Sequence, residues 1–397
     1  MQIYRRIFGA KLSSFEDPIA DIVIKDRSLG EHQLDLCHQL GLDLADWKKD
    51  KFSCPPQSLI FEEDIFFTKN FLKAVIELSQ SERKNLRFCL APNSFNERFV
   101  LPHASNPSEN LKFHFYYLHD ANSKTFEDVV VKQETWDNDI WLPPQIIPGR
   151  TLSYDICDNF AVRMASPFHQ LQATLALHLS QGVKIRKFFA KYFGPNFFHR
   201  FLKGGSRRFY SALKSRNKIG KNCLIHPTAI LEGVELEDNV VIGAQAIVRM
   251  SRIGEGTKIE DQALIKYCVI GKRNYISHTN QLIFCQTLDD VFSIHGPYQF
   301  SIFGRETAVM AVINCDLRLD QGTIKIQTDC GLLDSRQHLL GIAYGHKSKV
   351  GAGAAIAAGR IVPNDERIAP VDTIITQFKL SKNHISPNLI SEKLLDG

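Results

Sequence analysis

The sequence predicts an α/β domain in its first 180 residues, followed by an all-β, parallel β-helix of six-residue repeats. Two observations predict this fold. Strand-like and helix-like segments alternate up to about residue 180, whereas aliphatic residues recur at every sixth position after residue 218. A chain of 397 residues is also too long for one typical hydrophobic core, so we expect at least two domains.

The N-terminal domain, residues 1 to 182, is expected to alternate helices and strands. The elements expected in chain order are a helix over 28–42 that stops at Gly41, a strand over 58–61, a helix over 68–79 with Thr68 as its N-cap, strands over 86–90 and 113–118, and a helix over 167–181. This alternation favours layers of helices on a sheet.

Residues 183 to 218 form a basic, aromatic linker that we expect to be partly helical. From residue 184 onward it contains eleven Lys or Arg and no Asp or Glu, although the net charge of the whole chain is only +5. Nine aromatic residues alternate with these charges. Such a segment suits contact with an anionic membrane surface, or it serves as a clamp between domains. Nucleic-acid binding is not expected, because no motif for it accompanies the charge.

The repeat in the second half is regular. Its aliphatic anchors are spaced by six residues, and the leading anchors Ile219, Leu236, Ile253 and Ile270 are 17 residues apart. Six residues form one flat face, so three faces close a triangular coil with one inward anchor per face. A helix does not fit, because a six-residue step does not keep one face of a 3.6-residue helix. We therefore predict a β-helix over residues 219 to 370.

Between about residues 283 and 340 the repeat is irregular, and it returns at Val350, Ile356 and Val362. Aromatic residues and Pro297 interrupt the pattern, so we predict an insertion near residues 284 to 310 that leaves the solenoid as a loop. Insertions of this kind often carry the function of a solenoid. Residues 371 to 397 are expected to form a C-terminal tail.

The composition excludes several classes of protein. Nine cysteines are scattered singly without a CxxC pair, which argues against a zinc site or a disulfide framework and favours free thiols in a reducing cytoplasm. No apolar run approaches the roughly 18 residues that a membrane-spanning helix needs. The first residues are not followed by an apolar stretch, so secretion is not expected. We expect a cytoplasmic protein, either free or held at the inner membrane surface by its linker.

Several phrases, in the same order along the chain, resemble sugar-1-phosphate nucleotidylyltransferases. DRSLGEHQL at residues 26–34 is similar to their "nkPLlehQl", EDIFFT at 63–68 to "gDvlft", and SPFHQLQAT at 166–174 to "yPWDLLeAN". Asn314 with DLRLD at 316–320 resembles the "ANLRLD" coil of the archaeal-type bifunctional uridylyltransferase/amino-sugar acetyltransferases, and residues 341–360 resemble the coils that follow it. The resemblance implies a nucleotidylyltransferase-like N-terminal domain. It also implies a left-handed β-helix in a homotrimer, with acyl-CoA or substrate bound between neighbouring helices.

The chain also departs from this family at its nucleotide site. The family's Gly-rich loop, whose backbone N–H groups cradle phosphates, is here residues 1 to 15 with Gly9 as its only glycine. Ile19 stands in the place of the family's lysine, and His169 in the place of an aspartate. Asp64 remains and would be the ligand of a Mg²⁺ ion, although a structural role at a strand end explains it equally well. Nucleotidyl transfer is therefore expected to be lost or heavily altered.

For acyl transfer, a hexapeptide enzyme needs a histidine as general base. His278 is the first choice among His278, His295, His338 and His346, because it follows an anchor by two residues and should point outwards; a plain surface histidine is the alternative. The resemblance places Asn314 beside the amino sugar. Lys347 and Arg360 would meet the phosphates of CoA, or they are solvated charges.

Together these observations predict a transferase of sugar-nucleotide or cell-envelope precursor metabolism. The expected reaction is acyl transfer from acetyl-CoA or another acyl-CoA to an amino sugar, presented as a sugar phosphate or sugar nucleotide. The alternative is a non-catalytic trimeric scaffold or ligand-binding protein that contacts the inner membrane surface through residues 184 to 218. A γ-type carbonic anhydrase is a weaker alternative, because the histidines lack the spacing of three shared zinc ligands.

Overall fold

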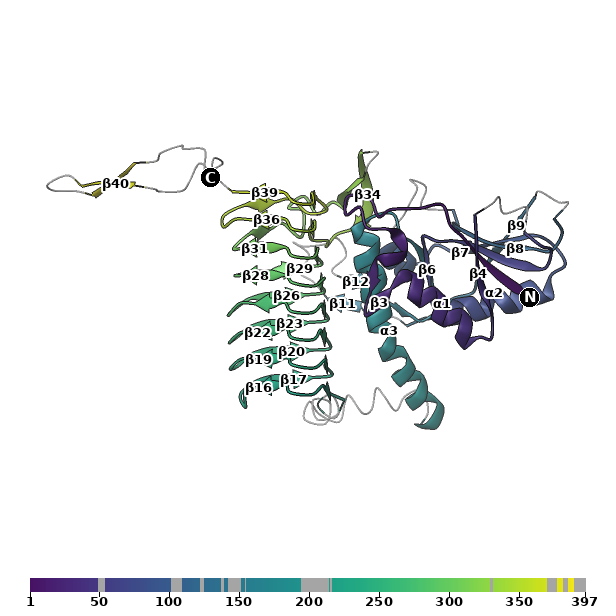
Figure 1. Ribbon diagram of the computed structural model, residues 1–397, viewed down its shortest axis with the longest axis horizontal. Coiled ribbons are helices and arrows are strands. Elements are labelled where there is room, and N and C mark those ends of the chain that lie inside the picture. The colour runs from purple at the N-terminus through teal and green to yellow at the C-terminus, as the bar shows by residue number, and fades with distance from the viewer. Residues whose placement is uncertain are drawn as a thin grey trace.

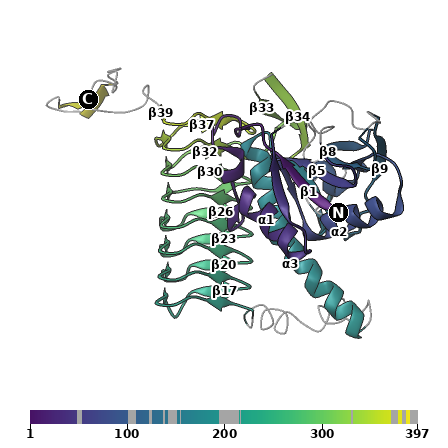
Figure 2. The ribbon, with the colours of Figure 1, turned by 45° about the vertical axis from the view of Figure 1, so that its right-hand side comes forward.

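An α/β domain and a parallel β-helix lie side by side in the computed structural model (Figure 1). The structure describes residues 1–48, 54–100, 109–121, 125–136, 139–141, 151–153, 155–193, 214, 216–328, 331–369, 377–380 and 385–388. The β-helix forms one long column of stacked coils, and the α/β domain flanks one side of it (Figures 1 and 2). The main division that the sequence predicts is therefore confirmed.

A six-stranded mixed sheet forms the centre of the N-terminal domain, in the order β4-β1-β5-β8-β7-β9. Its strands are β1 (Gln2–Arg6), β4 (Leu44–Trp47), β5 (Ser58–Glu62), β7 (Leu86–Leu90), β8 (Leu111–Leu118) and β9 (Glu127–Val130). Strand β1 runs parallel to both β4 and β5, whereas β8 runs antiparallel to β5 and β7. The carboxyl ends of β1, β4 and β5 therefore meet at one edge, where α/β sheets commonly bind ligands.

Two predicted helices are confirmed, the second with its predicted N-cap; the N-terminal cap of the first was not predicted. Helix α1 (Leu29–Gln39) begins with a capping box in which Ser28 accepts from the Glu31 N–H and the Glu31 carboxylate accepts from the Ser28 N–H. Helix α2 (Lys69–Ser81) begins at Thr68, whose hydroxyl accepts from the Phe71 N–H at 3.3 Å. The shorter elements of the domain are η1 (Ile19–Asp21), β2 (Val23–Ile24), β3 (Arg27–Ser28), β6 (Ile65–Phe67), the π-helical turn η3 (Asn96–Val100), β10 (Thr135–Trp136), β11 (Asp139–Trp141), β12 (Thr151–Ser153), β13 (Ile156–Cys157) and β14 (Ala161–Arg163).

The last helix of the domain is longer than predicted. Helix α3 (Pro167–Phe193) continues past the expected end at residue 181 and past the expected domain boundary at 182. Gly182 does not stop it, because helix-compatible residues follow and the stronger stop signal, Gly-Pro, comes only at residues 194–195. The linker is thus helical up to Phe193. Residues 194 to 213, which hold most of its aromatic residues, lie outside the described part of the chain.

The β-helix has three faces of short parallel strands. The first face contains β15 (Lys218–Ile219), β18 (Glu235–Leu236), β21 (Arg252–Ile253), β24 (Val269–Ile270), β27 (Gln286–Thr287), β30 (Ile302–Phe303), β35 (Ala343–Tyr344) and β38 (Ile361–Val362). The second contains β16 (Leu224–Ile225), β19 (Val241–Ile242), β22 (Lys258–Ile259), β25 (Tyr275–Ile276), β28 (Phe292–Ile294), β31 (Ala308–Met310), β36 (Lys349–Val350) and β39 (Arg367–Ile368). The third contains β17 (Ile230–Glu232), β20 (Ile247–Arg249), β23 (Leu264–Lys266), β26 (Gln281–Ile283) and β29 (Tyr298–Gln299), and after a gap β32 (Ile313–Asn314) paired with β37 (Ala355–Ile356).

The register of these strands follows the predicted repeat. Ile219 pairs with Leu236, Leu236 with Ile253, and Ile253 with Ile270, each 17 residues further along. Leu236, Ile253 and Ile270 are all buried in the interior of the coils. The later anchors Val350 and Val362 are buried as well. The six-residue spacing of aliphatic residues therefore marks the inward positions of the β-helix, as expected.

The predicted insertion near residues 284 to 310 was wrong. Strands β27 to β31 keep this segment inside the solenoid, and residues 293 to 304 are not a loop outside it. The pattern is hidden because the coil uses the fully buried aromatic anchors Tyr298 and Phe303, and because it is one residue short. Ile276 pairs with Ser293, whereas Leu282 pairs with Tyr298.

The segment that leaves the coils comes later. It is the antiparallel hairpin of β33 (Ile324–Thr328) and β34 (Gly331–Gln337), between β32 and β35. Near the C-terminus, β40 (Gln377–Leu380) pairs antiparallel with β41 (Ile385–Asn388), within the expected tail. No helix in the described residues is long and apolar enough to cross a membrane.

One buried hydrophobic cluster joins the two domains, whereas the interior of the coils forms a second cluster of its own. Helix α3 lies beside the column of coils (Figure 1), and it contacts β24, β27 and β30 of the first face. Phe168 and Leu171 of this helix belong to the same buried cluster as Phe300 and Ile302 of the coils. Because this contact is apolar and continuous, the α/β domain is docked on the solenoid rather than tethered to it.

His178 on α3 gives this docking a dependence on pH. Its Nε2 lies 2.8 Å from the carbonyl of Met250 in the β-helix, and burial lowers the pKa of His178 to about 4. Between pH 6.5 and 4 the unfolded chain therefore binds a proton at this site that the folded chain does not bind. The free energy of unfolding should fall as the pH is lowered through this window, by up to about 3 kcal/mol.

Urea unfolding at a series of pH values would measure this dependence. The His178→Gln variant keeps a donor for the Met250 carbonyl but cannot titrate, so its stability should change less between pH 7 and 4. Burial also lowers the pKa of His32, which therefore contributes in the same direction in both proteins. Equal pH dependence in the two proteins would show that His178 is not the group responsible.

Candidate functional site

The carboxyl ends of β1 and β5 hold the residues that the resemblance assigns to nucleotide binding. Asp64 lies in the turn between β5 and β6 and is 4% exposed. The Nε–H of Arg163 on β14 donates to its Oδ2 at 2.8 Å, and its Oδ1 has no hydrogen-bond partner among the described residues. Burial raises the pKa of Asp64, and Arg163 opposes this rise only in part. The carboxylate is thus held by an internal cation.

Glu62, at the end of β5, has internal partners as well. Arg6 donates to one of its oxygens at 2.8 Å, and His114 on β8 contacts the other. Burial pushes the pKa of Glu62 upwards, but the hydrogen bond from His114 and the nearby positive charges outweigh it, so the pKa lies below its ordinary value. Glu62 and Asp64 are therefore neutralised from within the domain.

These residues do not fit a Mg²⁺ site. Mg²⁺ requires a nearly octahedral set of oxygen ligands. Asp64 instead contacts the Arg163 guanidinium, and in the described residues no three His, Cys, Asp or Glu side chains are grouped to hold a metal ion.

The loop after β1 is also held by a contact within the domain. The backbone N–H groups of Phe8 and Ala10 both donate to one carboxylate oxygen of Glu63, each at 2.9 Å. Glu63 is 5% exposed, so this contact is buried. In the family that the sequence resembles, N–H groups of this loop cradle nucleotide phosphates. Here a built-in carboxylate takes the position of an anion on the loop.

His278 lies on the corner of the β-helix between the second and third faces, and it is exposed as predicted. Its Nδ1 lies 3.2 Å from the hydroxyl of Ser277, which orients the ring. The ring of His295, on the same corner of the next coil, packs edge-on with 5.2 Å between centroids. In the described part of the chain Nε2 of His278 has no hydrogen-bond partner, so it is available to a ligand.

The Asn314 side chain forms hydrogen bonds within the β-helix. Its Oδ1 accepts a hydrogen bond from the Tyr344 hydroxyl at 2.5 Å, and its Nδ2 donates to Ser301 at 3.1 Å. Tyr344 is fully buried inside the coils. The amide therefore satisfies a hydroxyl that would otherwise be buried without a partner.

Lys347 and Arg360 lie on two different corners of the β-helix. Lys347 is exposed on the corner between the first and second faces, and Glu306 and Asp365 hold the same position on the coils before and after it. Arg360, on the corner between the third and first faces, donates to the carbonyl of Lys325 at 2.9 Å and so holds the β33–β34 hairpin against the coil.

A single chain does not bring the four predicted residues of the acyl-transfer site together. His278, Lys347 and Arg360 occupy three different corners of the β-helix, and Asn314 lies on its third face. A site that uses more than one of these corners would need a neighbouring copy of the chain.

One buried polar cluster was not predicted from the sequence. His346 on the β-helix lies with its Nε2 2.8 Å from Asp17 of the loop that follows β1. Its Nδ1 accepts from the Arg305 backbone N–H at 2.8 Å, which places the ring proton on Nε2, where it donates to Asp17. The Arg305 guanidinium contacts the same carboxylate. Both ring nitrogens are used, so this cluster is a clamp between the domains.

Phe15 and Asn364 extend this clamp. The Phe15 ring packs on His346 with centroids 4.8 Å apart, and the Asn364 amide donates to the Phe15 carbonyl at 2.9 Å. The loop after β1 therefore serves as a docking segment. Asp17 and His346 are 329 residues apart in sequence, so no local pattern could have indicated this cluster.

Comparison with models of known protein families gave no match, and comparison with curated proteins gave none either. The candidate function therefore depends on the geometry of these sites.

Proposed function

We propose that the C-terminal region is a left-handed hexapeptide-repeat β-helix that transfers an acyl group from acetyl-CoA or another acyl-CoA to an amino sugar. The observation that carries this proposal is His278: an exposed imidazole on a regular corner, oriented by Ser277, with a free Nε2 among the described residues. This arrangement suits a general base, because a second group holds the ring while one nitrogen faces the ligand.

In the proposed reaction the sugar amine attacks the thioester carbonyl carbon. Nε2 of His278 removes the proton that the amine loses, the C–S bond breaks, and the proton passes to the CoA thiolate as it leaves. In the tautomer that leaves Nε2 free, Nδ1 carries the single N–H proton of the ring and donates a hydrogen bond to the Ser277 hydroxyl. We propose that a cytoplasmic homotrimer completes the site, since the remaining residues of the predicted site lie on two other corners and on the third face.

The N-terminal domain, on this proposal, no longer transfers nucleotides. The loop N–H groups already donate to the Glu63 carboxylate, and the Asp64 carboxylate already accepts from Arg163. These two internal contacts favour a binding or docking role for the domain.

An assay for thiol release tests the proposal. The full chain would be incubated with acetyl-CoA and a panel of amino sugars, amino-sugar phosphates and uridine-diphosphate amino sugars, and free CoA would be measured. We expect release with at least one acceptor, and a mass of three chains by light scattering. No release with any acceptor would contradict the proposal.

The same internal pairs favour a second candidate, a non-catalytic scaffold or ligand-binding protein. If both domains have lost catalysis, the acid-free segment at residues 184 to 218 becomes the main functional feature, as a contact to an anionic membrane. Flotation with vesicles of phosphatidylglycerol separates the candidates. The scaffold requires binding that salt weakens, whereas the enzyme requires none.

A further inference from the structure

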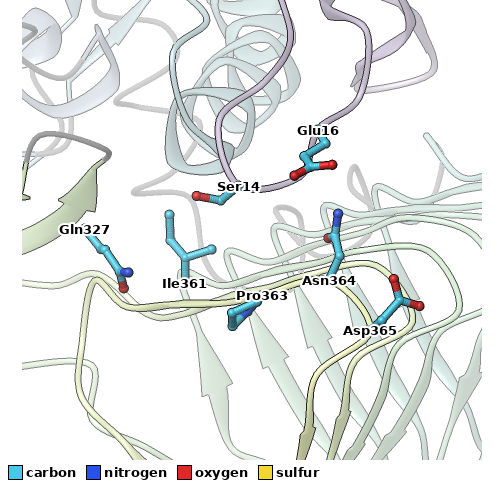
Figure 3. A pocket seen from close by; sticks show the side chains of 7 residues that line it. All are labelled: Ser14, Glu16, Gln327, Ile361, Pro363, Asn364 and Asp365. Carbon is cyan, nitrogen blue, oxygen red and sulfur yellow. The ribbon is translucent and has the colours of Figure 1, made fainter.

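A pocket of about 430 Å³ lies where the two domains meet, at the C-terminal end of the β-helix. Figure 3 shows its lining: Ser14 and Glu16 come from the loop after β1, Gln327 from the β33–β34 hairpin, and Ile361, Pro363 and Asp365 from the final coils. Its volume falls in the range of about 300 to 1,000 Å³ that is typical of sites for small molecules.

The charge of this pocket is negative. In the described residues neither Glu16 nor Asp365 forms an ion pair, and no Lys or Arg lines the pocket. Two cations of the adjoining coils have other partners: Arg305 contacts Asp17, and Arg360 donates to the Lys325 carbonyl. Lys347, one coil away on the same corner as Asp365, does not line the pocket. A phosphate group would therefore be repelled, and a cation would be attracted.

The rest of the lining suits a hydroxylated molecule. Ile361 and Pro363 provide an apolar floor, while the Ser14 hydroxyl and the Gln327 amide offer both donors and acceptors. In Figure 3 Glu16 and Asp365 lie towards one end of the pocket, and Gln327 approaches from the other. Asn364 also lines the pocket and is held in place, because it donates to the Phe15 carbonyl and accepts from the His346 N–H.

We propose that this pocket binds a small organic cation that carries hydroxyl groups, such as an unphosphorylated amino sugar, with its ammonium group near Glu16 and Asp365. A single metal ion is disfavoured, because the pocket is much larger than an ion and offers only two carboxylates. The pocket and His278 lie on different corners and several coils apart. This site is therefore separate from that of the proposed acyl transfer, and its existence does not depend on that reaction.

Binding here would couple to domain docking. The pocket is lined from both domains, so a bound ligand stabilises the docked state over any state in which the domains separate. The protein should accordingly become more resistant to heat as the ligand concentration rises above its dissociation constant.

Thermal unfolding and calorimetry of the full chain with glucosamine as the probe test this proposal. We expect glucosamine to raise Tm, and glucose and glucosamine 6-phosphate to have little effect. The double variant Glu16→Gln/Asp365→Asn should bind glucosamine at least about tenfold more weakly, since it loses both charges. Added NaCl should weaken binding to the unchanged protein, because the attraction is partly electrostatic.

Glu366→Gln is the matched control. Glu366 is exposed, directly follows Asp365 and does not line the pocket, so this variant loses one charge nearby and should bind glucosamine as before. The proposal is overturned if glucosamine causes no change, if the double variant binds it equally well, if the phosphorylated sugar binds better, or if Ca²⁺ alone reproduces the effect. Circular dichroism of each variant distinguishes a lost site from a lost fold.

Discussion

Replacing His278 by alanine is expected to lower kcat/KM for acyl transfer by a factor of about 10² to 10⁴, the usual contribution of a general base. Without the His278 imidazole, the attacking amine loses the base that Ser277 holds in position to take its proton. Stability should hardly change, because the side chain is exposed and its only described polar contact is with Ser277. Steady-state kinetics with the acceptor identified in the thiol assay would measure the loss.

Two other exposed histidines provide controls for this experiment. His295 lies on the same corner one coil further on, and His226 is hydrogen-bonded to Thr228 in the first coil at 2.8 Å. Alanine at either position should reduce the rate much less than His278→Ala. Added imidazole should restore part of the activity of the His278→Ala variant alone. If that variant is as active as the unchanged protein, the base is another group.

The position of His278 could be predicted because a solenoid converts sequence spacing into direction. Two residues after the buried anchor Ile276, the chain is at a corner and the side chain points outwards. The same rule placed most coils correctly. It failed near Tyr298 and Phe303, where aromatic side chains fill the interior and one residue is missing, so that neither the residue type nor the spacing matched the pattern.

The partners of the other predicted residues could not be predicted by any such rule. Arg163 reaches Asp64 across 99 positions of the sequence, and Tyr344 reaches Asn314 across 30. Such contacts depend on tertiary packing, which periodicity and capping signals do not encode. The sequence did indicate that the loop after β1 lacks the glycines of a phosphate-binding loop. It therefore indicated that this loop has a different role.

That role is visible in the contacts of the loop after β1. Its beginning is tied to Glu63 through the N–H groups of Phe8 and Ala10, and its end contacts the β-helix through Phe15 and Asp17. A segment held at both ends cannot open around a nucleotide without breaking the domain interface. We infer that docking and nucleotide binding are alternatives for this loop, and that the structure has the docked one.

Replacing Asp17 by alanine is therefore expected to destabilise the docked N-terminal domain by about 3 to 4 kcal/mol. The change removes the carboxylate that accepts from Nε2 of His346 and that pairs with Arg305. The His346 ring is nearly buried, with 11% of its side chain exposed, so its N–H would lose its acceptor without gaining full access to water. Asp17→Asn keeps one acceptor oxygen and should have an intermediate effect.

Urea unfolding measures this change separately in each domain. All three tryptophans, at positions 47, 136 and 141, lie in the N-terminal domain, whereas far-ultraviolet circular dichroism follows the β-helix as well. The two signals should change together in the unchanged protein, because a buried hydrophobic cluster joins the domains, and the fluorescence transition should move to lower urea in Asp17→Ala. Asp21→Ala removes the same charge from an exposed position four residues away and should change the stability by less than about 0.5 kcal/mol. Equal effects of the two substitutions would show that the contact between Asp17 and His346 does not hold the domains together.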